Sequence, residues 1–226
     1  LGVTTPGFSP CPPLGVHAFC HALPDIWHQV GGLLSAASCL TFSAVATGRS
    51  EAQTLAALDE SPDAPAQCWF APYLSGERTP HNDPQVRGGF LSLGVDTSGA
   101  AMTQSVLEGV AYAFRDARDA LAAAGTRISE ADLIGGGSRS AYWADVMANV
   151  LGMTLHQVEG SAHGCALGAA RLARMAAEGG PVQAAKPKRL RSFEPRPSLA
   201  RQYDEAFAHW RSLYGLLREV PSAQIA

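Results

Sequence analysis

The stretch Leu133-Ile134-Gly135-Gly136-Gly137-Ser138-Arg139-Ser140 decides the fold that we expect for this chain. Residues 131–134 have the length of a buried strand, and three glycines follow, where the backbone can take positive φ and approach a ligand without Cβ contacts. Residues 141–151 then predict a helix with Ser140 as its N-cap. The glycine turn therefore lies beside the unpaired N–H groups of a helix N-terminus, where anionic and nucleotide ligands bind. From these residues alone, a tight turn without a ligand is an equally good interpretation.

Length and composition indicate one globular domain. The 226 residues are 46% hydrophobic and 16% charged, which fits an α/β domain with a core and excludes a disordered segment. The formal net charge of −3 gives no sign of a nucleic-acid or membrane surface. The five cysteines show no paired spacing, and no stretch reaches the ~18 apolar residues of a membrane span. We therefore expect a soluble, cytoplasmic protein that binds neither nucleic acid nor a membrane.

Strands come early in the chain with little helix between them and then alternate with helices. Short strands are expected at residues 16–20, 26–30, 68–74, 89–93, 131–134 and 154–158, and helices at residues 33–46, 102–124, 141–151 and 165–177. A last helix carries a predicted core stripe made of Tyr203, Phe207, Trp210, Tyr214 and Leu217. The basic cluster at residues 186–191 is interpreted as a solvated loop. This order predicts an α/β fold, a mixed sheet with helices on both faces.

The glycine turn also has features of a dinucleotide-binding unit. Gly135-x-Gly137-x-x-Ser140 resembles GxGxxG, and Glu159 falls roughly where a ribose-binding acid would lie. Such a unit usually opens its domain, whereas about 130 residues precede it here. The position of the turn in the chain therefore argues against a dinucleotide-binding unit.

Two other groups of polar residues are candidates for a metal site or a binding site. The histidines at positions 17, 21 and 28 lie in strands and loops without the spacing of metal ligands, so no metal site is predicted. The loop of residues 75–84 places His81 beside Glu77, Arg78 and Asp83. Such a loop is ordered by internal ion pairs or lines a cleft, and both interpretations stay open.

Several segments, taken together, resemble the C-terminal half of the xylulose kinases, a subgroup of the FGGY carbohydrate kinase family. They are residues 16–24, 34–40, 72–84, 106–112, 133–140 and 166–173. The most specific for the subgroup are the sequences FCHALP at residues 19–24 and YLSGERTPHNDP at residues 73–84. The resemblance covers residues 1 to about 217. It implies a ribonuclease-H-like (actin-like ATPase) domain, so that residues 1–226 are the C-terminal, nucleotide-binding domain of such a kinase.

The resemblance also implies which residues bind ATP. The glycine turn would pack on adenosine and phosphate, Ala141 takes a place near the base where several relatives have Asn, and two residues of the helix at 33–46 fall where relatives face the nucleotide. The implied nucleotide-binding residues are Gly135, Gly136, Gly137, Ser138, Arg139, Ala141, Ala37 and Thr41.

The implied reaction transfers the γ-phosphoryl group of ATP to the C5 hydroxyl of D-xylulose, giving xylulose 5-phosphate, with Mg²⁺ on the phosphates. The family takes the catalytic base and most sugar contacts from an N-terminal domain that residues 1–226 do not include. No catalytic residue and no metal ligand are therefore assigned here, and we expect this chain alone to be inactive. The alternatives are a kinase for another pentulose or polyol and a stand-alone nucleotide-binding or interaction module. A homodimer is a further possibility for the partner of this chain.

Overall fold

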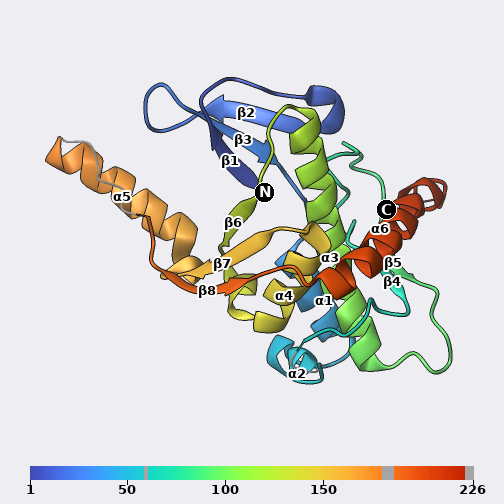
Figure 1. Ribbon diagram of the computed structural model, residues 1–226. Coiled ribbons are helices and arrows are strands. Elements are labelled where there is room, and N and C mark those ends of the chain that lie inside the picture. Colours follow the sequence, from blue (N-terminus) through green and yellow to red (C-terminus); the bar gives the residue numbers. More distant parts are fainter. Residues whose placement is uncertain (59–60, 180–185, 222–226) are drawn as a thin grey trace.

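The structure is a computed structural model that describes residues 1–58, 61–179 and 186–221 (Figure 1). Its strands are β1 (Gly2–Thr5), β2 (Val16–Cys20), β3 (Trp27–Gly31), β4 (Trp69–Ala71), β5 (Gly89–Leu91), β6 (Glu130–Leu133), β7 (Thr154–Val158) and β8 (Arg189–Phe193). Its α-helices are α1 (Ala37–Ala46), α2 (Glu51–Leu55), α3 (Gly99–Ala123), α4 (Ala141–Leu151), α5 (Gly164–Glu178) and α6 (Pro197–Leu217). Three short 3-10 helices are η1 (Pro12–Leu14), η2 (Gly136–Arg139) and η3 (Ser161–His163).

The mixed sheet that the sequence predicts is present in β6, β7 and β8. Strands β6 and β7 are parallel because α4 connects them, and β8 runs antiparallel to β7. The remaining strands form an antiparallel sheet in the order β1-β3-β2 and an antiparallel pair of β4 with β5. The strands are thus divided among three sheets.

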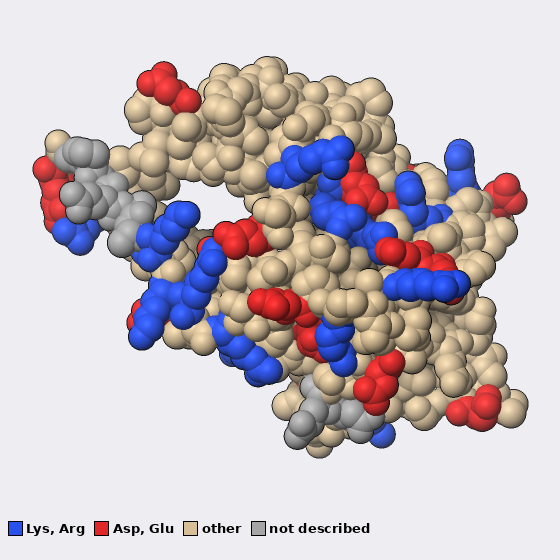
Figure 2. Space-filling model, in the orientation of Figure 1, with Lys and Arg blue, Asp and Glu red and all other residues tan. Residues whose placement is uncertain are grey.

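Strand β8 corrects the interpretation of residues 186–191 as a solvated loop. Phe193 is buried against the β7 side chain Leu155, and the backbone of β8 pairs with β7. The basic side chains of residues 186–191 are exposed, and Arg189 pairs with Glu130 at 2.6 Å. Figure 2 shows basic and acidic side chains interspersed on one face of the molecule. Charged residues are rare in strands but common on edge strands such as β8. The composition of this segment therefore did not indicate a strand.

Helix α3 is the central element of the fold (Figure 1). Ser98 caps its N-terminus by accepting a hydrogen bond from the Ala101 N–H, and α1, α4 and β4 all pack against it. Its buried residues Val106, Leu107 and Val110 belong to the largest hydrophobic cluster. The helix begins three residues before the predicted start at residue 102, because the cap sits at Ser98.

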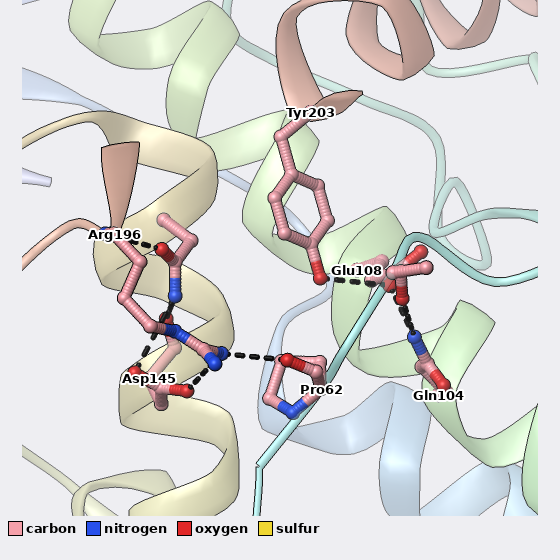
Figure 3. Close-up of polar contacts among 8 residues, drawn as sticks. Pro62, Gln104, Glu108, Asp145, Arg196 and Tyr203 are labelled. Atoms are coloured by element: carbon pink, nitrogen blue, oxygen red, sulfur yellow. Dashed lines mark hydrogen bonds and ion pairs between the residues drawn. The ribbon is translucent and has the colours of Figure 1, made fainter. Parts of the chain in front are cut away.

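Helix α6 closes this core with the predicted aromatic stripe. Tyr203, Phe207 and Trp210 are buried, which confirms the prediction, and Tyr214 and Leu217 are partly buried beside them. Figure 3 shows the polar contacts at the start of this helix: Arg196 pairs with Asp145 at 2.8 Å and donates to the Pro62 carbonyl oxygen. These contacts join α6 to α4 and to the loop before β4.

Other helices also differ from the predictions. Helix α1 begins at Ala37 rather than at residue 33, and the short helix α2 is not predicted at all. Helix α5 extends one residue beyond the predicted range of residues 165–177 at each end, and none of its residues is buried. None of the described helices is both long and apolar enough to cross a membrane.

Candidate functional site

The glycine turn leaves the carboxyl end of β6 and continues as the 3-10 helix η2. Gly135 has φ +88° and ψ −179°, a conformation that side chains rarely adopt. A Cβ on Gly137 would lie 3.1 Å from the indole ring of Trp143. A Cβ on Gly136 would meet only the Arg139 guanidinium, at 3.6 Å. The fold itself therefore requires glycine at positions 135 and 137, whereas packing within this chain gives no reason for glycine at 136.

Ser138 holds the turn from inside. Its side chain is buried, and its hydroxyl donates to the Gly135 carbonyl oxygen at 2.7 Å and is hydrogen-bonded to the Ser161 hydroxyl at 3.1 Å. Gln157 donates to the Ser138 carbonyl oxygen at 2.9 Å, and the Gly135 N–H donates to the Ser161 carbonyl oxygen. The turn is thus anchored to the end of β7 and to η3.

Helix α4 begins directly after the turn, as predicted. The Ser140 hydroxyl accepts a hydrogen bond from the Trp143 N–H at 3.2 Å, and this confirms Ser140 as the N-cap. Gly136, Arg139 and Ala141 are exposed around this helix N-terminus. The surface therefore combines backbone N–H groups, a helix dipole and one guanidinium, with little side-chain bulk, which suits a phosphate-bearing ligand.

The two predicted residues on α1 are also exposed. Ala37 is the first residue of the helix, and its N-cap Ala36 makes no side-chain capping bond. The Thr41 hydroxyl donates to the Glu51 carboxylate at the start of α2. Helices α1 and α4 both pack against α3, so both belong to one core.

The loop of residues 75–84 is ordered in a way that the sequence did not predict. Glu77 is only 1% exposed, and burial raises its pKa to about 7. His81 stacks on Tyr214 with ring centroids 3.5 Å apart, and burial, with a smaller effect of Arg211, lowers the pKa of His81 to about 4. Asp83 accepts a hydrogen bond from the Tyr214 hydroxyl. Hydrogen bonds and ring packing order this loop, whereas the sequence left open whether internal ion pairs order it or it lines a cleft.

A concave surface lies at the N-terminus of α3, apart from the glycine turn. It is a cavity of about 320 Å³, and residues 65–67, 96–98, Gln104 and Tyr142 are among those that line it. Tyr142 follows Ala141 in α4, so the cavity adjoins the helix that begins at the glycine turn. The sequence analysis did not predict this cavity. No group of three or more His, Cys, Asp or Glu side chains in the described part of the chain is placed to hold a metal ion.

Comparison with known proteins adds a family to this geometry. Residues 6–177 match the model of the FGGY family of carbohydrate kinases, C-terminal domain. The chain therefore belongs to the FGGY family. This membership confirms the resemblance seen in the sequence and removes the ground for a dinucleotide-binding unit.

The FGGY relatives include xylulose kinases. The chain is 47% identical over 172 residues to the xylulose kinase of Escherichia coli K12, which covers 76% of this chain and 36% of the relative. It is 41% identical over 205 residues to that of Klebsiella pneumoniae, which covers 90% of this chain and 41% of the relative. The FGGY chain thus spans about two fifths of the length of these curated relatives.

A solved structure shows the same fold. The crystal structure of a xyloylose kinase from Brucella ovis matches with a TM-score of 0.90 and 42% identity, over 96% of this chain and 45% of that chain. The FGGY domain described here therefore has the ribonuclease-H-like, actin-like ATPase fold that the resemblance implies.

Proposed function

We propose that this chain is the nucleotide-binding domain of a xylulose kinase and that it binds ATP at the glycine turn between β6 and α4. The observation that carries the proposal is the turn itself: exposed glycine backbone at a helix N-terminus, in a chain 41–47% identical to two xylulose kinases. In the longer enzyme, the γ-phosphoryl group of ATP passes to the C5 hydroxyl of D-xylulose.

The exposed residues of the site take distinct roles in this proposal. The backbone of residues 135–138 packs on adenosine and phosphate, and Arg139 pairs with phosphate oxygens, as guanidinium groups do. Ala141 lies near the base. Ala37 and Thr41 form the second side of the site on α1. Because the described residues place no cluster of metal ligands, Mg²⁺ would be carried here by the nucleotide phosphates.

The chain supplies binding but not the activation of the sugar. Phosphoryl transfer to a hydroxyl needs a base within hydrogen-bond reach of that hydroxyl. We place this base and the sugar contacts in the part of the relatives' length that the chain does not span. The purified chain is therefore expected to bind MgATP and to form no xylulose 5-phosphate, and detection of that product would contradict this division of roles.

Calorimetric titration with MgATP tests the nucleotide site. Gly136→Ala adds a methyl group that this chain can accommodate but a ligand packed on the turn cannot, so we expect the Kd to rise about tenfold or more. The matched control is Gly168→Ala on α5, where a Cβ would meet nothing within 4 Å, and it should bind like the wild type. No binding by the wild type, or equal binding by Gly136→Ala, would refute the proposed site.

A further inference from the structure

The loop of residues 75–84 is hydrogen-bonded to the segment that leads from β3 into α1. The Thr79 N–H donates to the Gly32 carbonyl oxygen at 3.0 Å, and the Thr79 hydroxyl accepts from the Gly32 N–H at 2.9 Å. The same hydroxyl donates to the Gly15 carbonyl oxygen at 2.9 Å. Thr79 is fully buried. One threonine therefore joins this loop to the turn before β2 and to the segment after β3.

Glu77 makes the next connection along the same segment. Its Oε1 accepts hydrogen bonds from the Leu34 N–H at 3.2 Å and from the Arg78 N–H at 2.7 Å, whereas its buried Oε2 has no hydrogen-bond partner. A carboxyl group that is buried and only partly hydrogen-bonded is costly for stability. What it supplies is an acceptor for a backbone N–H that lies outside any helix or strand.

The other end of the loop, around Asp83, is held by several hydrogen bonds. Glu77 and Asp83 exchange two backbone hydrogen bonds of 2.8 Å, and Asp83 accepts hydrogen bonds from the N–H groups of Gln85 and Val86. The Tyr214 hydroxyl of α6 also donates to Asp83. The loop therefore connects α6 to residues 32–34 through hydrogen bonds at both of its ends.

Residues 32–36 are the segment whose backbone is hydrogen-bonded to this loop. They form neither helix nor strand, and α1 begins immediately after them without a capping side chain. The N–H groups of Gly32 and Leu34 find their acceptors in the side chains of Thr79 and Glu77. Ala37, the first residue of α1, follows directly, so these two side chains help to position the helix N-terminus, together with the packing of α1 against α3.

We propose that Glu77 and Thr79 are positioning residues for nucleotide binding, which hold residues 32–36 so that the N-terminal turn of α1 meets the nucleotide. The inference rests on the proposed function. It assigns the two residues no contact with the ligand, so they should act on affinity through the backbone of Gly32 and Leu34.

Paired variants of the full chain test this role. Thr79→Val removes the hydroxyl and Thr79→Ser keeps it, while Glu77→Leu removes the acceptor and Glu77→Gln keeps an Oε1 in its place. The readouts are the Kd for MgATP, measured well below the melting temperature of each variant, and the exchange rates of the Gly32 and Leu34 amides. Tyr203→Phe, which removes a buried hydrogen bond remote from this segment, is the control for lost stability.

We expect Thr79→Val and Glu77→Leu to raise the Kd about tenfold and to speed amide exchange at Gly32 and Leu34. Thr79→Ser, Glu77→Gln and Tyr203→Phe should stay within about threefold of the wild type. Wild-type affinity in Thr79→Val, or equal loss in Thr79→Val and Thr79→Ser, overturns the inference. If Glu77→Leu does not fold, the comparison of Thr79→Val with Thr79→Ser alone tests the inference. A wild type that binds no MgATP overturns the proposed function itself, and this inference with it.

Discussion

The Tyr203 hydroxyl donates a 3.1 Å hydrogen bond to the carboxylate of Glu108, which lies 95 residues earlier in the chain (Figure 3). Glu108 is 1% exposed and also accepts hydrogen bonds from the Gln104 side chain and from the Ala66 N–H. Helix α6, helix α3 and the loop before β4 therefore meet at one buried carboxyl group. Burial raises the pKa of Glu108 to about 7 in spite of these donors, so stability should depend on pH.

Glu108→Gln should flatten the fall in stability at neutral pH. Because the pKa of Glu108 is raised from 4.5 to about 7, the folded state holds a proton that the unfolded state has lost between these values, and the free energy of unfolding falls as pH rises through this range. The full effect is on the order of 3 kcal/mol. Glutamine keeps an acceptor at Oε1 but cannot ionise.

Urea unfolding of both proteins from pH 5 to pH 8 measures this difference. The pKa of Glu77 and that of Asp116, raised by burial to about 7 and about 6, act in the same direction, so the variant keeps part of the slope. Identical slopes in the two proteins would show that Glu108 does not titrate in this range.

Tyr203→Phe should lower the free energy of unfolding by about 1–3 kcal/mol, because it removes a hydrogen bond to a buried carboxyl group. The loss should be larger at pH 8 than at pH 5, since the ionised carboxylate depends more on its donors. Denaturant unfolding at the two pH values measures it. A loss that is the same at both would indicate that Glu108 stays in one protonation state.

Gly137→Ala should destabilise the chain, whereas Gly136→Ala should not. The new methyl group at 137 would lie 3.1 Å from the Trp143 ring, which is itself held by a hydrogen bond from its indole N–H to the Leu107 carbonyl oxygen. We expect a cost of about 1–3 kcal/mol at 137 and a change within about 0.5 kcal/mol at 136. Thermal unfolding compares them, and equal melting temperatures would contradict the close approach.

His81→Phe should remove part of the acid sensitivity. The pKa of His81 is lowered from 6.5 to about 4, so between these values the unfolded state binds the proton and the folded state does not. Stability is therefore lost as pH falls from about 6.5 towards 4. Phenylalanine keeps a ring to stack on Tyr214 but has no charge to gain. Unfolding curves from pH 4 to pH 7 should be flatter for the variant, and an unchanged acid limb would argue against the neutral, buried state of His81.

The elements predicted best are those whose causes are local. Helix α4 has the predicted bounds because Ser140 is its cap and Gly152, in the left-handed conformation, ends it. The aromatic stripe of α6 is buried as predicted, because a period of three to four residues specifies one helix face. The family could be inferred from short motifs such as YLSGERTPHNDP, but the nucleotide contacts of Ala37, Thr41 and the glycine turn stay predictions.

The sequence by itself determined the turn at Gly135–Gly137, the N-cap of α4 and the apolar helix faces, because neighbouring residues suffice for backbone conformation and helical period. Only the tertiary structure decided that residues 189–193 form β8, that α1 begins at Ala37, and that Glu77 and Thr79 are buried beside the segment before it. The partners concerned are 43 and 47 residues apart in the last case. Hydrogen bonds between residues so far apart in the sequence form only when the chain has folded, so no local sequence pattern can predict them.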